Sequence, residues 1–386
     1  METVLFVNHL RRGSASSYRQ EGFAACLSRR GFRTALICPR GHGTGSNSFP
    51  APFDEVSFFS EPFPMNLASN SAKLSAAMRR ANVIHVNRAS PYTASLLMMP
   101  GHPHRRALVV DMEDLDGYGG YSSYVGSYGP KGWALTAFEK VFPRRAGAVL
   151  AVSRLLRTNM LRSGVREDRI FIVPNGYDAK MFRPEIDADA AKREFGVSDH
   201  PVVMYSSTYW SFEKAQHMTA LTAFKLISER VPGARLLMTG RLTPEIVAML
   251  QALGIEDRVV RTGFVPRSSM PVVMAAADIA IHVISGHPFH VASSPMIVPE
   301  YLAMGKPVVA PMIGELVAML GGGAGVLVPR SDPKLLADAA VELLRDRSLR
   351  MRVGASASAR ASQTYSYDAE TETLVEAYER AVSSAH

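Results

Sequence analysis

The chain has 386 residues, of which 47% are hydrophobic and 20% are charged, and its formal net charge is +8. This length suits two domains of ordinary size, and the composition is that of a folded globular protein rather than a disordered one. The positive charge favours anionic partners, but no zinc-finger, RNP or basic-heptad pattern is present and only two cysteines occur, so neither nucleic acid as a partner nor a Cys-ligated zinc site is expected.

Short apolar runs alternate with longer amphipathic stretches from the start of the chain, which is typical of a parallel sheet with crossover helices. In the first half we predict strands at 3–7, 34–38, 83–86, 108–112, 148–152 and 170–173. Helices are predicted between most of them, including 17–30, 72–80 and 133–142. The first half therefore has the pattern of a doubly wound α/β domain.

The same alternation then restarts, with predicted strands at 202–205, 235–238, 259–263, 279–283, 307–310 and 325–328. Helices are predicted at 214–230, 244–253 and 333–344, and beyond residue 345 the chain is predicted to be helical only. We therefore expect an α/β protein with two Rossmann-like domains facing each other across a cleft. The N-terminal domain spans 1–182 and is joined by the C-terminal helix 366–386, and the C-terminal domain spans 183–365.

No apolar run reaches the roughly 20 residues that a membrane-spanning helix needs. The first residues lack the basic start and long apolar stretch of a signal peptide, so we expect a cytoplasmic protein. One segment suggests peripheral contact with the inner face of an anionic membrane, because it mixes bulky apolar and basic residues: Lys131, Trp133, Phe138, Lys140, Phe142, Arg144 and Arg145. The alternative is a core-facing helix with basic edges.

In doubly wound sheets ligands bind at the carboxyl ends of the strands, so the segments after strands are where a site is expected. Residues 293–310 read Ser-Ser-Pro-Met-Ile-Val-Pro-Glu-Tyr-Leu-Ala-Met-Gly-Lys-Pro-Val-Val-Ala. We predict that Ser293 or Ser294 caps a short helix with Pro295 in its first turn, and that free N–H groups there bind a phosphate. Glu300, further along that helix, would accept hydrogen bonds from a ribose; the alternative is an ordinary exposed glutamate.

This segment and residues 174–184, Pro-Asn-Gly-Tyr-Asp-Ala-Lys-Met-Phe-Arg-Pro, together resemble the GT-B glycosyltransferases, and within them the large retaining family four. That family shows Pro-Asn-Gly-x-Asp-x-x-x-Phe-x-Pro at the end of a strand, and later a Glu followed by Ala-x-Gly-x-Pro-Val-Val. The run Gly263-Phe264-Val265 resembles its loop that contacts the nucleotide base. Matches at 151–153, 276–278 and 325–329 extend the similarity to nearly the whole chain.

The resemblance implies a hexosyltransferase-type enzyme that moves a sugar from a UDP- or GDP-linked donor to an acceptor hydroxyl, with retention and without a metal or cofactor. The acceptor, whether a glycan, a lipid-linked molecule or a small molecule, stays open. Positive groups would stabilise the departing nucleoside diphosphate. For catalysis it implies Lys214 and Glu300, and for donor binding Gly13, Ser207, Arg241, Gly263, Phe264, Val265, Ser294, Pro295, Met296 and Ile297.

The chain departs from the family pattern at three positions. Many relatives carry a first glutamate seven residues before the second, where this chain has Ala292. A subset instead carries Ser-Pro-x-Lys, and Ile297 stands at that lysine. The family's diphosphate arginine after the first strand of the second domain is missing, and Arg241, after the next strand, is the candidate to replace it.

The acidic run 111–116, Asp-Met-Glu-Asp-Leu-Asp, follows a predicted strand and should border the cleft. Relatives often place a His or Asp in this region, so we assign Asp114 to the catalytic set; a solvated loop is the alternative. Asp114 and Asp116 also mimic the Asp-x-Asp metal motif of the other large glycosyltransferase fold. Because two matched halves argue against that fold, and His282, His287 and His290 lack metal-site spacing, we expect no metal.

Two further functions remain open. A catalytically silent nucleotide-sugar-binding scaffold of the same fold would account for the missing glutamate and arginine. A nucleotide-sugar epimerase of similar two-domain fold would work without any acceptor.

Overall fold

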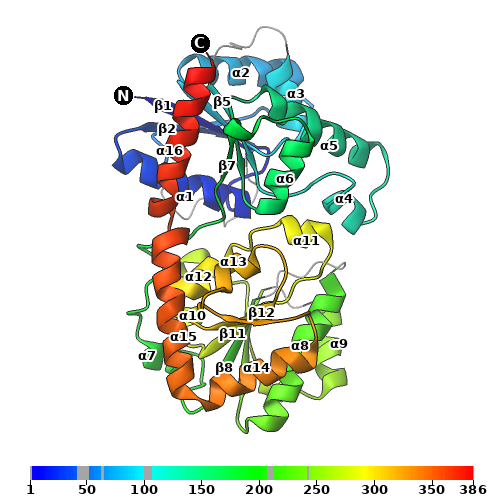
Figure 1. The fold of residues 1–386 in the computed structure, drawn as a ribbon, viewed down its shortest axis with the longest axis vertical. Coiled ribbons are helices and arrows are strands. Elements are labelled where there is room, and N and C mark those ends of the chain that lie inside the picture. The colour runs from blue at the N-terminus through cyan, green and yellow to red at the C-terminus, as the bar shows by residue number, and fades with distance from the viewer. Residues whose placement is uncertain are drawn as a thin grey trace. The chain divides into compact units, whose positions relative to one another are not determined.

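The computed structural model describes residues 2–40, 52–61, 65–99, 107–206, 213–240 and 243–385. The chain folds into two compact units, and Figure 1 labels many of their elements. Unit 1 comprises Met1–Gly176, His287–Ser294 and Tyr367–His386, and unit 2 comprises Tyr177–Gly286 and Pro295–Ser366. The sequence analysis put the main boundary at residue 182 and gave 287–294 to the C-terminal domain, whereas the structure packs that short segment into unit 1.

Unit 1 contains a seven-stranded parallel sheet in the order β3-β2-β1-β4-β5-β6-β7. Its strands are β1 (Thr3–Val7), β2 (Arg33–Cys38), β3 (Glu55–Phe58), β4 (Val83–Asn87), β5 (Ala107–Met112), β6 (Ala148–Ala151) and β7 (Ile170–Ile172). Strand β1 pairs with β2 on one side and with β4 on the other. The strand order therefore reverses between β1 and β4, and their carboxyl ends are where a doubly wound sheet binds ligands.

Unit 2 contains a six-stranded parallel sheet in the order β10-β9-β8-β11-β12-β13. Its strands are β8 (Val202–Ser206), β9 (Arg235–Thr239), β10 (Val259–Gly263), β11 (Ile279–Ile281), β12 (Val308–Pro311) and β13 (Val326–Val328). Here the reversal lies between β8 and β11. The two units thus repeat one architecture, as the sequence predicts.

Helices connect the strands of both sheets. Those of unit 1 are α1 (Ala15–Arg29), α2 (Leu67–Arg79), α3 (Pro91–Met98), α4 (Tyr121–Tyr124), α5 (Pro130–Val141), α6 (Arg154–Arg162), α11 (Pro288–Ala292) and α16 (Tyr367–Ser384). Those of unit 2 are α7 (Ala188–Glu194), α8 (Lys214–Arg230), α9 (Pro244–Leu253), α10 (Met270–Ala275), α12 (Ile297–Ala303), α13 (Leu316–Leu320), α14 (Pro333–Arg345) and α15 (Arg347–Arg360). None of the described helices is long and apolar enough to span a bilayer.

Local sequence signals explain several of these helix starts. The Ser14 side chain accepts a hydrogen bond from the Ser17 N–H at the start of α1, and Ser153 does the same for Leu156 at the start of α6. Asp332 accepts from two N–H groups of α14, and Pro333 supplies its first residue. Each cap satisfies an amide that the helix itself leaves without a partner.

Most strands are buried on both faces, so each sheet lies between two apolar layers. In unit 1, α16, red in Figure 1, packs on β5, β6 and α1, and its Leu374 and Tyr378 join the core around Val109. Burial on both faces explains why these strands read as continuous apolar runs. In unit 2 the corresponding layers are formed around Tyr301 and Leu302 of α12 on one side and Phe224 of α8 on the other.

Candidate functional site

The loop after β1 leads to the candidate donor residue Gly13. Gly13 adopts a left-handed conformation with φ of +84°, and its N–H donates to the Ser17 Oγ at 2.8 Å. No described atom lies within 4 Å of where a side chain would begin. The backbone here is therefore open at the carboxyl end of β1, as a close approach to a ligand would require.

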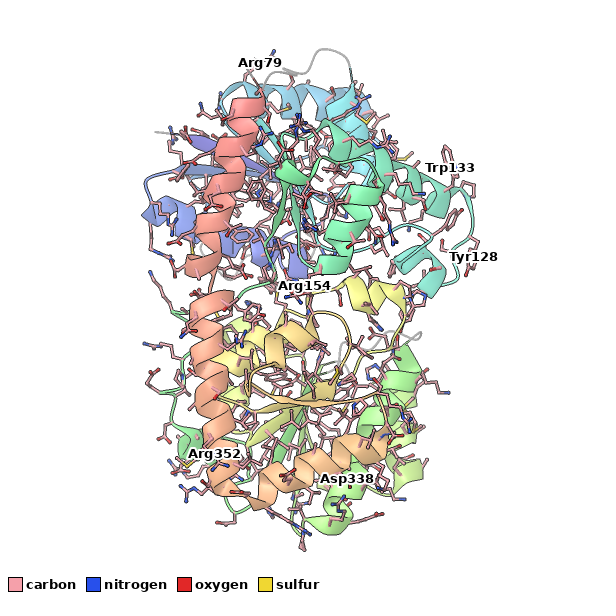
Figure 2. The ribbon with its side chains drawn as sticks, in the orientation of Figure 1. Arg79, Tyr128, Trp133, Arg154, Asp338 and Arg352 are labelled. Atoms are coloured by element: carbon pink, nitrogen blue, oxygen red, sulfur yellow. The ribbon has the colours of Figure 1, made fainter. Side chains whose placement is uncertain are left out.

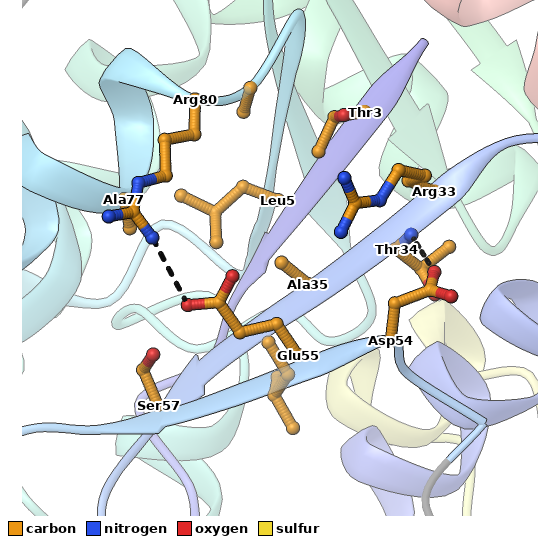
Figure 3. A pocket seen from close by; sticks show the side chains of 12 residues that line it. Thr3, Leu5, Arg33, Thr34, Ala35, Asp54, Glu55, Ser57, Ala77 and Arg80 are labelled. Carbon is orange, nitrogen blue, oxygen red and sulfur yellow. Dashed lines mark hydrogen bonds and ion pairs between the residues drawn. The ribbon is translucent and has the colours of Figure 1, made fainter. Parts of the chain in front are cut away.

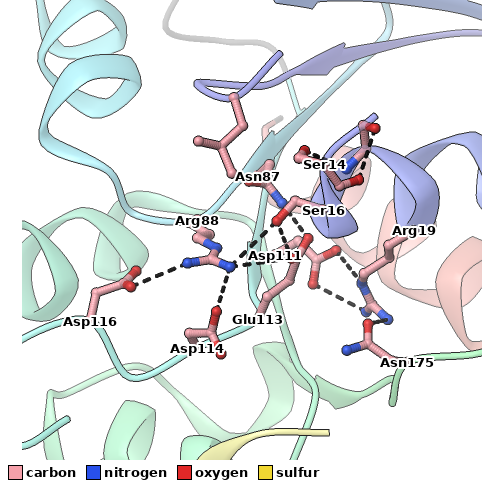
Figure 4. Close-up of polar contacts among 12 residues, drawn as sticks. Ser14, Ser16, Arg19, Asn87, Arg88, Asp111, Glu113, Asp114, Asp116 and Asn175 are labelled. Carbon is pink, nitrogen blue, oxygen red and sulfur yellow. Dashed lines mark hydrogen bonds and ion pairs between the residues drawn. The ribbon is translucent and has the colours of Figure 1, made fainter. Parts of the chain in front are cut away.

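Arg88, directly after β4, is surrounded by three carboxylates that follow β5 (Figure 4). Its guanidinium pairs with Asp114, lies 3.3 Å from Asp116 Oδ1, and lies 3.8 Å from Glu113 Oε2. We call these four residues the Arg88 cluster. Arg88 is also the one non-glycine residue with positive φ, 59°, among the described residues. Such a conformation costs of order 1–3 kcal/mol and is concentrated at functional sites.

The structure places Asp114 in this cluster, where it is the most exposed of the three carboxylates, at 20% of its side chain. Burial raises the pKa of Asp114, while Arg88 and His290 oppose the rise. Burial likewise raises the pKa of Asp116 to about 6 and that of Glu113 to about 7, with Arg88 opposing both. Asp114 and Asp116 both pair with a guanidinium, and no group of three or more metal-ligating side chains occurs in the described part of the chain.

Glu113 is held more tightly than its neighbours. The Ser16 hydroxyl at the start of α1 donates to Glu113 Oε2 at 2.6 Å, and the Asn87 amide donates to Oε1. Glu113 thus ties the start of α1 to the carboxyl ends of β4 and β5. The sequence analysis did not single out Glu113 or Arg88, although an arginine after one strand and an acidic run after the next were visible.

A second buried ion pair lies beside the cluster (Figure 4). Arg19 of α1 donates to Asp111 from Nε at 2.8 Å and from Nη2 at 3.2 Å, and both side chains are fully buried. Burial alone would raise the pKa of Asp111, but Arg19 and His85 outweigh it and lower the value to about 2. Arg19 also donates to the carbonyl oxygen of Val173 at 2.8 Å. This pair fixes α1 to the ends of β5 and β7.

The predicted helix cap at Ser293 or Ser294 is wrong. The Ser294 Oγ accepts the Asn175 N–H at 3.0 Å, its carbonyl accepts the Asn175 side-chain amide at 2.7 Å, and Ser293 Oγ donates to the His290 carbonyl. Helix α12 begins only at Ile297, after Pro295, and Met296 provides no side-chain cap. The serines are thus used to hold other backbone segments. No described residue accepts a hydrogen bond from the Met296 or Ile297 N–H groups.

Glu300 is buried, with only 2% of the residue exposed, so it is not an ordinary exposed helix glutamate. Arg267 Nη2 lies 2.6 Å from its Oε1. Burial raises the pKa of Glu300, and Arg267 counteracts that rise. The sequence analysis missed Arg267, although it directly follows the Gly263–Pro266 run.

Phe264 of the Gly263 loop and Lys214 are both exposed. Gly263 has φ of +69° and its carbonyl accepts the Gly240 N–H, while Phe264 is 83% exposed and Val265 packs against the core of unit 2. Lys214 is exposed at the first position of α8. Ser207 and Arg241 lie outside the described residues, so their assignment stays a prediction.

Segment 287–294 lies in unit 1 because its apolar side chains find partners there. Tyr124 of α4 packs against His287, His290 and Phe289 with ring centroids 4.8–5.4 Å apart. Ala292, at the position of the family's first glutamate, is fully buried in the same core as α6. The histidines of this segment therefore serve packing, and His287 also accepts the Phe289 N–H at 3.2 Å.

A cavity of about 170 Å³ opens at the opposite ends of the strands (Figure 3). Thr3, Arg33 and Glu55, the first residues of β1, β2 and β3, line it together with Arg80, which lies 3.7 Å from Glu55. Because ligands of doubly wound sheets bind at the carboxyl ends, we do not assign this cavity to the site.

Two family models match the chain. Residues 16–176 match the glycosyl transferase 4-like domain, and residues 200–346 match the glycosyl transferases group 1. The chain belongs to this glycosyltransferase family. Its fold is GT-B: over 97% of this chain and 99% of the other, it matches the Anabaena protein Alr3699/HepE, solved with UDP and glucose, at a TM-score of 0.78 and 21% identity.

Curated relatives of this family member resemble parts of the chain. It is 32% identical over 197 residues to a D-inositol 3-phosphate glycosyltransferase of Corynebacterium efficiens, covering 48% of this chain and 45% of that protein. It is 29% identical over 225 residues to a GDP-mannose-dependent α-(1-6)-phosphatidylinositol monomannoside mannosyltransferase of Mycolicibacterium smegmatis, covering 56% and 58%. The chain thus spans about half the length of the curated relatives it matches.

Proposed function

We propose that this glycosyltransferase family member moves a sugar from a nucleoside diphosphate sugar to an acceptor hydroxyl, with retention at the anomeric carbon and without a metal ion. The observation that carries the proposal concerns Glu300, at the family's ribose-binding position: this residue is buried and forms an ion pair with Arg267. Burying an unpaired carboxylate reduces the free energy of unfolding, and the packing of α12 alone does not require a carboxylate at position 300.

The nucleotide end of the donor is assigned to unit 2. Glu300 accepts hydrogen bonds from the ribose hydroxyls, and the open backbone at Gly263 with the exposed Phe264 contacts the base. The N–H groups of Met296 and Ile297, for which no described residue is an acceptor, together with the exposed Lys214, stabilise the diphosphate as negative charge develops on it. UDP and GDP are both candidates, since the solved neighbour was crystallised with UDP and one relative is named for GDP-mannose.

The acceptor is assigned to unit 1, at the carboxyl ends of β1, β4 and β5. Asp114 is the least buried carboxylate of the Arg88 cluster and the one we propose to contact the acceptor or the transferred sugar. A carboxylate accepts hydrogen bonds from hydroxyl groups, and Arg88 fixes its position. The open backbone at Gly13 lies after β1, at the same edge of the sheet.

A screen of nucleoside diphosphates and nucleotide sugars by thermal shift tests donor binding, because a ligand stabilises the folded state in proportion to its affinity. The preferred nucleotide sugar is then incubated with and without candidate hydroxyl acceptors while free nucleoside diphosphate is measured. Acceptor-dependent release supports the transferase. Binding without any release identifies the silent scaffold, and conversion of the sugar without an acceptor identifies the epimerase.

We further propose peripheral contact with an anionic membrane through unit 1 of a cytoplasmic enzyme. Tyr128 and Trp133 are 69% and 67% exposed at the start of α5, and both project from the ribbon in Figure 2. Exposed basic residues flank them, namely Lys131, Lys140, Arg144 and Arg145. The sequence analysis had included Phe142 in this surface, but Phe142 is buried, so it does not take part. Aromatic and basic side chains together suit an anionic lipid surface.

A further inference from the structure

Arg267 and Glu300 form an ion pair inside unit 2 that the family pattern does not account for. Arg267 begins a short 3-10 turn, Arg267–Ser269, just after the Gly263 loop, and Glu300 lies on α12. Their side chains are 14% and 3% exposed. The ion pair therefore connects the Gly263 loop, which we assign to the nucleotide base, with Glu300, which we assign to the ribose.

Arg267 is held in place independently of Glu300. Its guanidinium lies over the Phe182 ring, 5.4 Å from the centroid, and its Nη1 lies 3.8 Å from the Met296 sulfur. A planar guanidinium stacked on an aromatic ring has few orientations left. Arg267 therefore presents Nη2 to Glu300 from a fixed direction.

Glu300 has few other charges around it. Burial raises the pKa of this carboxyl, Arg267 opposes the rise, and the Tyr301 phenol on the same helix stays neutral because burial raises its pKa. Arg267 Nη2 lies 2.6 Å from Glu300 Oε1, so its positive charge lies directly against this carboxylate. A carboxylate offers about four lone-pair sites, so this contact with Arg267 leaves sites that can accept hydrogen bonds from a ligand.

We propose that Arg267 is a positioning residue that holds the Glu300 carboxylate in place and keeps it ionised, so that it accepts hydrogen bonds from the ribose hydroxyls of the nucleotide. This inference rests on the proposed function, which supplies the ribose. It assigns to Arg267 an effect on nucleotide binding through the protonation state of its partner.

The test is the pH dependence of nucleoside diphosphate affinity in the variant Arg267→Gln, measured by calorimetric titration from pH 5.5 to 8.5. Loss of a nearby positive charge raises a carboxyl pKa by about 1–3 units, so the pH below which affinity falls should move up by that amount. Below that pH, the affinity of Arg267→Gln for the nucleotide should drop roughly tenfold per pH unit. Near pH 8.5 the affinity of the variant should approach that of the wild type. Arg261→Gln is the matched control, because Arg261 pairs with Glu256 at 2.9 Å but both are about one-third exposed.

Two further variants, Glu300→Gln and Arg267→Lys, separate an effect on the ionisation of Glu300 from a folding defect. In a Glu300→Gln background nothing titrates at this position, so Arg267→Gln should leave the pH profile unchanged; a shift there would overturn the inference. Arg267→Lys keeps the charge and should keep the wild-type profile, which guards against a folding defect in Arg267→Gln. If Glu300→Gln binds nucleotide as the wild type does, the proposed function fails. If Glu300→Gln weakens binding but Arg267→Gln matches Arg261→Gln at every pH, only the inference fails.

Discussion

The charged side chains at the carboxyl edges of the two sheets are paired to different extents. In unit 1 the charged side chains pair with one another: Arg19 with Asp111, and Arg88 with the three carboxylates of its cluster. These groups are mostly buried and tie α1 and the loops to the strand ends. The unit 1 edge is thus largely occupied by the protein's own contacts.

The described residues at the carboxyl edge of unit 2 show a different pattern. One buried pair, Arg267 with Glu300, is present, while Lys214 and Phe264 are exposed and two N–H groups at the start of α12 have no described acceptor. The difference indicates that a bound ligand can interact with the charged and polar groups of the unit 2 edge, whereas those of the unit 1 edge already interact with one another. Changes to the charges of unit 1 should therefore reduce stability, and changes in unit 2 should reduce nucleotide binding.

The largest effect on stability is expected for Asp111→Asn, because it leaves the fully buried Arg19 without its counter-charge. Breaking one side of such a pair costs about 3–5 kcal/mol of unfolding free energy. Urea denaturation measures the loss, and Glu256→Gln, which breaks an exposed pair, should cost at most about 1 kcal/mol. A loss for Asp111→Asn as small as that of the control would contradict the contrast between the two edges.

The pH dependence of stability sharpens the comparison. Burial raises the pKa of Glu113 from 4.5 to about 7, so its folded form binds a proton more tightly than its unfolded form. The resulting stabilisation is fully present below about pH 4.5 and is lost as pH rises to about 7. The shift corresponds to about 3 kcal/mol. Urea midpoints at pH 5 and pH 7.5 should therefore differ less in Glu113→Gln than in the wild type, and equal differences would break this part of the account.

The strands were predictable because buried parallel strands are continuous apolar runs, and every predicted strand is present. Strand β3 was missed since it lies at the sheet edge with only partly buried side chains, which removes the apolar signal. Segment 287–294 was assigned by its order in the chain, whereas packing of Tyr124 on His290 decides its place. Chain order does not reveal such contacts.

The candidate site was predictable where a short motif carries it. Glu300 and Gly263 were identified from runs of adjacent residues. Arg267 was not, because its partner Glu300 lies 33 positions further along the chain. The pairing of Arg88 with Asp116 was missed for the same reason, since these two residues are also far apart in the sequence. Ser294 was assigned to a helix cap since nothing in the sequence shows that Asn175 uses its hydroxyl.

A smaller effect is expected at the exposed surface of unit 1. Trp133→Ala removes a large apolar side chain that we propose to bury in an anionic membrane, so flotation with anionic liposomes should fall about tenfold, which corresponds to about 1.4 kcal/mol. Met351→Ala is the matched control, because Met351 is 64% exposed on α15 of unit 2. If the two variants float alike, or if neutral liposomes bind the wild type equally well, the membrane proposal is wrong.

No effect at all is expected from chelation. Asp114 and Asp116 pair with Arg88, and the proposed diphosphate contacts are a lysine and backbone N–H groups. Glycosyl transfer measured in excess EDTA should therefore match the untreated rate. Loss of activity that magnesium or manganese restores would show that a metal ion supplies the positive charge.

Calorimetric titration of the preferred nucleoside diphosphate into wild type and Glu300→Ala tests the central claim most directly. A hydrogen bond to a charged group contributes about 1.5–3 kcal/mol, so affinity should fall roughly 10- to 150-fold. Because Glu300 is buried beside Arg267, melting curves are recorded on the same samples to show that the variant is folded. A folded Glu300→Ala variant that binds the nucleotide with wild-type affinity would contradict the assignment of unit 2 as the nucleotide-binding unit through Glu300.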